Sequence, residues 1–594
     1  MTGGMKLFPN TDLEALRGWL DRRAASLKRE REPHEAGWKT LSEHYEPDLG
    51  RALFEDDPDV ERRAAPRRDR KLLTSTPRTE LRRMAAAMKS GTANESRQWF
   101  RLRLKGQDRA QAENPAWTQW LDAVTRGMAA LLDQSNAYGA VGQLFHHAVL
   151  FGQGAALVTG DHPEDILDVR VIDTGAFWIG STRRGRVDVL LRRVSMTARE
   201  ILEEFGEKRC PESAARACEA GSDERRFALW NLVCPNAGGR FPDLDRGKTP
   251  FASVWWSETR DECGGEDTAG VIDIRGYGWN PILCPRWDVL DGVYGTGPGR
   301  IGMPEVLELY RLELDSLKGI AQRVDPPLAA PEGMEGRAVN TYPGGITYYP
   351  ESTGRDRSLH SLIDQPPDVQ AVEMKIQQVE ARLRRVFYAD LFNAILTVAN
   401  TSNTQMTARQ VEEMSGEKIS LLGPVLTNLN HGLFDPLIDA VFAIMAEAGL
   451  IPEPPEAMAG AEFQAEYVST LHMRQQEEAR LGGLMRFSQF ASGLLAASPA
   501  SADKIDFDQM LDEAAQALAV PGGCIRSDAD VRKIRERRAQ AEQEMQQAAA
   551  QAELGRQAPG YADAAKTLSE TRAGGASALE TLLGAAGPTG GGML

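Results

Sequence analysis

Two long amphipathic helices stand out in the middle of the chain. Residues 303–325 carry apolar side chains at helical spacing, and polar residues occupy the opposite side. Gly302 and Pro304 mark the start of this helix, and Pro326 ends it, because proline cannot donate the next backbone hydrogen bond. Residues 368–392 form the second predicted helix, in which apolar residues step three and four positions alternately, as in a heptad repeat. One side of each helix therefore needs a packing partner.

The residues of the two helices divide into a packing set and a polar set. The predicted packing positions are Val306, Tyr310, Leu317, Val369, Val372, Ile376, Val379, Leu383 and Val386. The predicted polar positions are Lys318, Gln370, Gln378, Arg382 and Arg385. This division predicts a helical hairpin that packs along one side and faces water along the other.

Segments without a clear hydrophobic period flank the second helix. Residues 326–367 are rich in Pro, Gly and Tyr, and they hold too few aliphatic residues for a core of their own. Residues 393–406 are mostly small, uncharged residues that can form hydrogen bonds. A third helix is predicted from Thr407, where the sequence has capping-box spacing. Gly423, followed by proline, is expected to kink this helix, and Gly449 is expected to end the next one.

Strand-like patterns are concentrated between residues 155 and 289. There, runs of β-branched, aliphatic and aromatic residues are separated by Gly, Pro and Asp, and the tryptophans are expected in the core rather than on a base-stacking surface. Residues 11–135 look mostly helical, and residues 461–554 are again helical, with a final segment typical of a long exposed helix. The sequence predicts an α+β fold that is mainly helical.

The charge balance limits what the protein can bind. The 594 residues include 85 acidic and 69 basic side chains, which gives a net charge of −16 and argues against an extensive basic surface that grips nucleic acid. Acidity that serves solubility explains this charge. Basic clusters at residues 22–23, 28–31 and 62–71 are interpreted as solvated helix faces rather than DNA contacts.

Cysteine usage and hydropathy point to a reduced, water-soluble protein. The six cysteines show neither metal-site spacing nor a compact disulfide framework, so free thiols are expected. The N-terminal residues lack a signal-peptide pattern. The most apolar run, residues 436–451, is interrupted by Asp439 and Glu447, so no membrane partner is predicted.

Motifs for catalysis, metal or cofactor binding are missing from the sequence. Residues 247–249 resemble the end of a phosphate-binding loop, but Pro242 stands where its first glycine should be. His146 and His147 would point about 100° apart on a helix and would make a poor metal pair. The alternate glycines of residues 295–299 are expected to let the chain turn sharply into the helix that follows. No catalytic residue, metal ligand or cofactor is therefore predicted.

The order of helix, Pro/Gly-rich insert, helix, polar loop and kinked helix resembles the portal, or head-to-tail connector, proteins of short-tailed double-stranded DNA bacteriophages. The segments follow the expected order over about three quarters of the chain, and this order carries the resemblance. Further segments that share it are residues 70–102, 120–158, 195–206 and 407–444.

The resemblance implies a ring-forming portal architecture of about twelve copies at one capsid vertex. Apolar stripes of neighbouring copies would pack together, and polar faces would line the bore. The implied parts are a wing (residues 1–302, with a strand-rich part at 155–289, and residues 407–452), two stem helices (303–325 and 368–392), a clip (326–367), a tunnel loop (393–406), a helical crown (453–560) and a flexible tail (561–594).

The resemblance also implies which residues and partners take part. The tunnel-loop candidates for contact with DNA are Asn393, Asn400, Asn403, Thr404 and Gln405. The clip candidates for docking are Tyr342, Tyr348 and Tyr349. The implied partners are further copies of the chain, the major capsid and scaffolding proteins, the terminase large subunit, tail adaptor proteins and double-stranded DNA, in the virion and, during assembly, in the host cytoplasm.

Two other classes of protein are alternatives. A coiled-coil scaffold would explain the heptad repeat, but it would not explain the insert, the polar loop and the strand-rich region together. A genome-packaging ATPase or nuclease would need a phosphate-binding loop or a cluster of metal-binding carboxylates, and neither is evident.

Overall fold

The computed structural model describes most of the chain up to residue 467 and short stretches beyond it. The described residues are 8, 10–53, 72–104, 115–160, 166–207, 209–258, 269–290, 292–325, 328–329, 360–361, 368–389, 422–455, 463–467, 487–488, 491, 508, 510–511, 531–545, 547, 566, 572–573 and 576–577. The chain divides into two compact units, Met1–Met510 and Leu511–Leu594, and each is described by itself.

A five-stranded sheet follows chain order in the first unit, and every adjacent pair of its strands is antiparallel. Two short helices, α7 (Ala198–Phe205) and α8 (Glu212–Glu219), connect the second strand to the third. The strands are β4 (Phe177–Ser181), β5 (Val187–Thr197), β6 (Arg226–Pro235), β7 (Phe251–Ser257) and β8 (Val271–Tyr277).

Both faces of this sheet are covered, which explains the nearly continuous apolar runs of its central strands. Along β6, Trp230 and Leu232 pack with α1 (Leu13–Tyr45), whereas Phe227 and Leu229 pack with α7 and α8. The prediction that the tryptophans of this region belong to the core is confirmed for Trp255, Trp256, Trp279 and Trp287.

The largest core surrounds α6 (Ala137–Phe151), which is buried on almost every side. The helices α3 (Thr76–Thr92), α5 (Pro115–Gln134) and α14 (Asp435–Glu447) contribute to this core. A three-stranded sheet also contributes, with β2 (Ala155–Thr159) between β3 (Asp168–Ile172) and β9 (Ile282–Leu283). Beside it, β1 (Phe100–Leu104) pairs with β12 (Phe463–Tyr467). These elements and the larger sheet form the body of the first unit.

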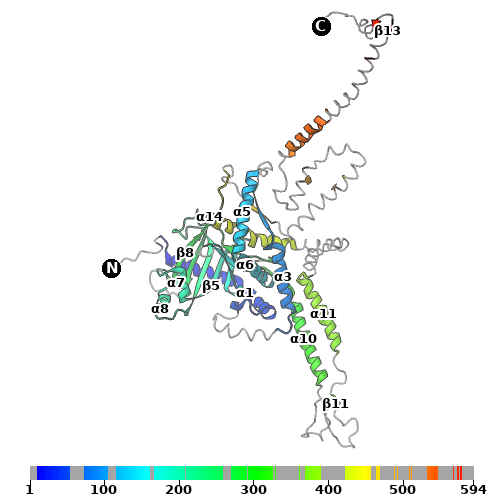
Figure 1. Ribbon diagram of the computed structural model, residues 1–594. Coiled ribbons are helices and arrows are strands. Elements are labelled where there is room, and N and C mark those ends of the chain that lie inside the picture. The colour runs from blue at the N-terminus through cyan, green and yellow to red at the C-terminus, as the bar shows by residue number, and fades with distance from the viewer. Residues whose placement is uncertain are drawn as a thin grey trace. The chain divides into compact units, whose positions relative to one another are not determined.

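Two long helices, α10 (Met303–Val324) and α11 (Val369–Val386), lie side by side and project from the body (Figure 1). The predicted boundaries of the first helix are confirmed, since Gly302 precedes it and Asp325 caps its end. The side chain of Asp368 caps α11 by accepting two backbone N–H groups. Unlike the prediction, α11 ends at Val386 rather than at residue 392, because Tyr388 adopts a φ of 50°, which no α-helix contains.

The predicted strand runs are confirmed as β2, β3, β5, β6, β7 and β8. The sequence missed β4 because its five residues, FWIGS, do not alternate and end in Gly-Ser. The predicted helix start at Thr407 lies outside the described residues, which resume at Leu422, so the predicted kink at Gly423 stays a prediction. Further along the same helix, η7 (Asn430–Phe434) is a π-helical turn, where a Cβ on Gly432 would lie 2.5 Å from the Cys284 carbonyl oxygen. The predicted end at Gly449 is confirmed by its φ of 67°.

Among the described residues, one helical stretch, Leu422–Glu447, is long and apolar enough to cross a membrane by length and composition alone. Half of its most apolar window is buried, and α14 within it lines the main core, as in the core helix of a globular protein. In the second unit, residues 531–545 are helical and almost entirely exposed, as the sequence predicted. A short antiparallel pair, β13 (Arg572–Ala573) and β14 (Ala576–Ser577), follows them.

Candidate functional site

The hairpin of α10 and α11 buries its predicted packing residues mostly inside one chain. Val369, Val372 and Val386 of α11 are half-buried. The heptad row of α11 is therefore covered largely within one chain, and its three half-buried positions keep part of their surface in solvent. The fully buried positions of the hairpin include Val306, Leu309, Tyr310, Ile376, Val379 and Leu383.

A second row of apolar side chains on the hairpin remains in solvent. Leu317, Ile320 and Val324 of α10 are 57%, 44% and 79% exposed. Their spacing of three and four residues continues the side of α10 that the body covers at Val306 and Tyr310. Contiguous apolar side chains in water are typical of a surface that another molecule covers.

Three polar contacts fasten the base of the hairpin to the body. The Tyr310 hydroxyl donates a hydrogen bond of 2.6 Å to the carbonyl oxygen of His44, at the end of α1. The Thr76 hydroxyl, at the start of α3, donates to Glu380 of α11 at 2.8 Å. Arg384 of α11 lies 3.7 Å from the carboxylate of Glu80 in α3. Among the described residues, these contacts fix the hairpin to α1 and α3 at its base.

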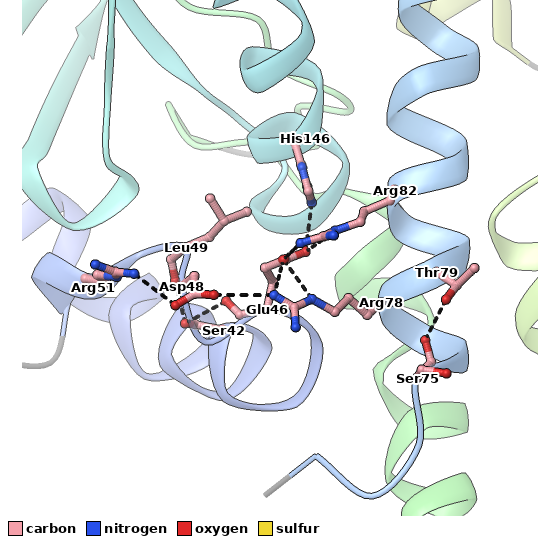
Figure 2. Close-up of polar contacts among 10 residues, drawn as sticks. All are labelled: Ser42, Glu46, Asp48, Leu49, Arg51, Ser75, Arg78, Thr79, Arg82 and His146. Atoms are coloured by element: carbon pink, nitrogen blue, oxygen red, sulfur yellow. Dashed lines mark hydrogen bonds and ion pairs between the residues drawn. The ribbon is translucent and has the colours of Figure 1, made fainter. Parts of the chain in front are cut away.

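Immediately behind this base, Glu46 forms a charged junction between three helices (Figure 2). Glu46 follows α1, and its side chain is only 3% exposed. Arg78 and Arg82 of α3 form ion pairs with it, the first at 2.6 Å, and the Nε2 atom of His146 in α6 lies 3.1 Å from its second oxygen. The junction joins α1, which receives the hairpin, to the buried helix of the main core.

The electrostatics of this junction favour the ionised carboxylate. Burial alone would raise the pKa of Glu46, but hydrogen bonds from His146, Arg82 and Arg78 lower it to about 2. The neighbouring Asp48 also accepts a contact from Arg78 at 3.3 Å, so Arg78 bridges two carboxylates. The hydroxyl of Tyr45, the residue before Glu46, is buried and has no hydrogen-bond partner among the described residues.

The glycines before α10 have a different role from the one predicted. None of Gly295, Gly297 and Gly299 has a positive φ. A Cβ on these residues would instead lie 2.4–2.7 Å from carbonyl oxygens at the end of α6, between Ala148 and Gly152. Glycine is needed there because the two backbones touch, and not because the chain turns sharply.

The other predicted site residues divide into those that are exposed, those that are paired and those outside the described residues. Lys318, Gln370, Gln378 and Arg385 are exposed on the hairpin. Arg382, also predicted on the polar side, is half-buried and forms an ion pair with Glu308 of α10. Outside the described residues lie Tyr342, Tyr348, Tyr349, Asn393, Asn400, Asn403, Thr404 and Gln405.

Sequence reasoning missed the Glu46 junction. His146 had been considered only as half of a metal pair with His147, whose ring in fact contacts the Thr174 hydroxyl at 2.9 Å. The spacing of Arg78 and Arg82, one helical turn apart, was the only local signal. The basic cluster at residues 28–31 was interpreted as solvated, but Arg31 is buried, donates to the Gly175 and Phe177 carbonyl oxygens and stacks on a tryptophan.

Catalytic chemistry has no visible centre in the described part of the chain. No group of three or more His, Cys, Asp or Glu side chains there could hold a metal ion. Cys218, Cys234 and Cys284 are free thiols. Burial raises the pKa of Cys234 and of Cys284 to about 12, so neither is a ready nucleophile.

Comparisons with known proteins agree with the architecture. The sequence model of a family described as "Bacteriophage head to tail connecting protein" matches residues 17–525. The chain is 31% identical over 570 residues to the portal protein of Salmonella phage epsilon15, which covers 96% of this chain and 98% of the relative. It is 30% identical over 528 residues to the probable portal protein of Bordetella phage BPP-1, which covers 89% of this chain and 92% of the relative.

Proposed function

The chain belongs to the family of bacteriophage head-to-tail connecting proteins and acts as a viral portal, and we propose that its hairpins form the wall of the channel in a ring of about twelve copies. The exposed apolar row of α10 carries this proposal. A monomer gains nothing from Leu317, Ile320 and Val324 in water, whereas a ring covers the same row on every copy.

In this ring each part of the chain has a mechanical task. The body is the wing, α10 and α11 are the stem, residues 326–367 are the clip and residues 393–406 are the tunnel loop. The fixed base at His44, Thr76 and Glu80 holds each stem at a set angle to its wing. Double-stranded DNA then passes along a bore whose polar side chains offer weak, exchangeable contacts, so that it is packaged and later ejected without sticking.

The role is structural, and the protein belongs to the virion as part of the head-to-tail connection of the capsid. The capsid and scaffolding proteins would surround the wing. The terminase motor would dock on the clip during assembly in the host cytoplasm, and tail adaptor proteins would replace it. ATP hydrolysis would belong to the motor, which agrees with the absence of a phosphate-binding loop in this sequence.

Electron microscopy of the purified full-length protein tests the ring directly. Rings with a central channel and a narrow projecting stem are expected, and their symmetry would give the copy number. Compact monomers or open filaments that persist across salt and protein concentrations would contradict the proposal, and filaments would favour the coiled-coil scaffold.

The passage of DNA is tested in the tunnel loop. The double substitution Asn400→Lys and Asn403→Lys should leave rings intact but slow packaging or impair genome retention, because the added charges attract phosphates. The matched control replaces the same two residues with glutamine. Normal packaging and retention by the lysine variant would remove the loop from the DNA path.

A further inference from the structure

The two long flanks of the hairpin carry opposite charge, and we propose that the acidic flank of one copy docks on the basic flank of the next. The inference rests on the proposed ring and specifies which surfaces meet within it. A ring is built from head-to-tail contacts, in which two different surfaces of the same chain must fit each other. The hairpin supplies two such surfaces.

Glu313, Glu373 and Glu380 form the acidic flank. Glu373 and Glu380 are seven residues apart and therefore lie on one face of α11. Glu313 is five residues from Glu308 and therefore about 140° around α10 from the side on which Glu308 pairs with Lys375 and Arg382, which places it on the acidic side of the hairpin. Burial and the charges of Glu373 and Glu380 raise the pKa of Glu313. Glu380 is held at the base by Thr76 and Arg384. Within the described part of the chain, neither Glu313 nor Glu373 forms an ion pair.

The basic flank lies on the other side of the hairpin, where Glu308 meets α11. Lys375 lies 3.2 Å from the Glu308 carboxylate, and Arg382 pairs with its other oxygen. Lys375 follows Glu373 by two residues, and Arg382 follows Glu380 by two residues. Each cation therefore lies about 200° around α11 from the acidic residue before it. Arg311 and Lys318 lie on the same side of α10 as Glu308, and Arg311 forms an ion pair with Asp315 at 3.0 Å. Four cations and two carboxylates leave this flank positive.

The exposed apolar row lies beside the acidic flank. On the helical wheel, Leu317, Ile320 and Val324 surround the position of Glu313. A partner that covers the row also removes water from Glu313, and a carboxylate in that setting needs a cation. DNA is a poor occupant because its phosphates would be repelled. The basic flank of a second copy offers Arg311 and Lys318. Their aliphatic stems fit the apolar row, and their charges fit Glu313.

Charge reversal on each flank tests the contact. The acid-reversed variant carries Glu313→Lys and Glu373→Lys, and the base-reversed variant carries Arg311→Glu and Lys318→Glu. In either variant alone, neighbouring flanks have the same charge, so the fraction assembled into rings should fall by about tenfold or more. In an equimolar mixture the two variants can alternate, and rings with an even number of copies and equal amounts of each variant should return.

Native mass spectrometry and electron microscopy give both the ring size and the composition. A fourfold variant with all the changes exchanges the two flanks and should form rings by itself. The control Glu219→Lys with Glu224→Lys makes the same charge change as the acid-reversed variant at exposed positions away from the hairpin, and it should assemble like the wild type. Full assembly of either reversed variant alone, or no rings in the mixture, would overturn the inference. Absence of wild-type rings would instead overturn the proposed ring.

Discussion

The body and the hairpin of the first unit use apolar residues in opposite ways. In the body, both faces of the five-stranded sheet are covered and α6 is enclosed by helices and strands. In the hairpin, the apolar row of Leu317, Ile320 and Val324 lies in water. The body therefore covers its own apolar surface, whereas the hairpin leaves part of its apolar surface in water, where the proposed ring would cover it.

The largest expected effect comes from a charge inside the hairpin. Val379 is fully buried between α10 and its neighbours, and Val379→Asp should destabilise the hairpin by about 4 kcal/mol, because the carboxylate has no partner there. Hydrogen exchange should show faster exchange in α10 and α11 while α6 stays protected. Val369→Asp, at a half-buried position near the end of the hairpin, is the control with a much smaller effect. Equal loss of protection in α6 would show that hairpin and body unfold as one unit.

The hairpin was the part of the fold that the sequence predicted best. Its hydrophobic period and its proline stop are local signals, and local signals can be recognised in a single sequence. Residue 392 was a wrong end point because the positive φ of Tyr388 has no sequence signature. Val306 and Leu317 lie on the same side of α10, and only the position of the body decides that Val306 is buried and Leu317 exposed. Spacing alone could not predict this difference.

The second-largest loss of stability is expected in the body, where the backbone at Gly297 contacts the backbone at the end of α6. Gly297→Ala should cost about 3 kcal/mol, since its Cβ would lie 2.6 Å from the carbonyl oxygens of Ala148 and Val149. Thermal unfolding measured by circular dichroism would record a lower midpoint. The control is Gly37→Ala on the exposed side of α1, where nothing lies within 4 Å of the added Cβ and the helix should gain stability. Equal midpoints for Gly297→Ala and the wild type would show that the contact is looser than described.

The Glu46 junction could not be predicted, because its members come from distant parts of the sequence. His146 is 100 residues from Glu46 and Arg78 is 32 residues away. Each was interpretable only as a surface charge until the fold placed them together. The burial of Arg31 could not be predicted for the same reason. Its basic neighbours in the sequence suggest a solvated side chain, but in the fold it stacks on Trp178 and donates a hydrogen bond to the backbone of β4.

An intermediate effect is expected at this junction, which links the two regions. Glu46→Gln keeps the shape but removes the charge, and it should destabilise the protein by about 2 kcal/mol at neutral pH. The control is Asp48→Asn, because Asp48 is half exposed and its pairs with Arg51 and Arg78 should contribute less than about 0.5 kcal/mol. Denaturant unfolding measures both. Similar losses in the two variants would show that burial adds nothing to the Glu46 contacts.

The same residue predicts a dependence on pH. The pKa of Glu46 is lowered from 4.5 to about 2 in the folded protein, so its contribution is fully present above pH 4.5 and is lost as the pH falls towards 2. Glutamine does not titrate. The difference in unfolding free energy between the wild type and Glu46→Gln should therefore be constant from pH 7 to about pH 5 and shrink below it. A difference that stays constant down to pH 3 would exclude Glu46 as its source.

The smallest expected change in monomer stability comes from Leu317, and it tests whether the apolar row of the hairpin serves assembly. Leu317 is 57% exposed, so Leu317→Ser should change the unfolding free energy of the monomer by less than about 0.5 kcal/mol. Assembly should nevertheless weaken, because each contact between copies loses a covered leucine. Leu290→Ser is the matched control, since Leu290 lies in the body and is 79% exposed, and it should change neither quantity. Sedimentation and unfolding of both variants separate the two roles. If Leu317→Ser assembles like Leu290→Ser, the apolar row of the hairpin does not serve contacts between copies, and another surface of the chain must close the ring.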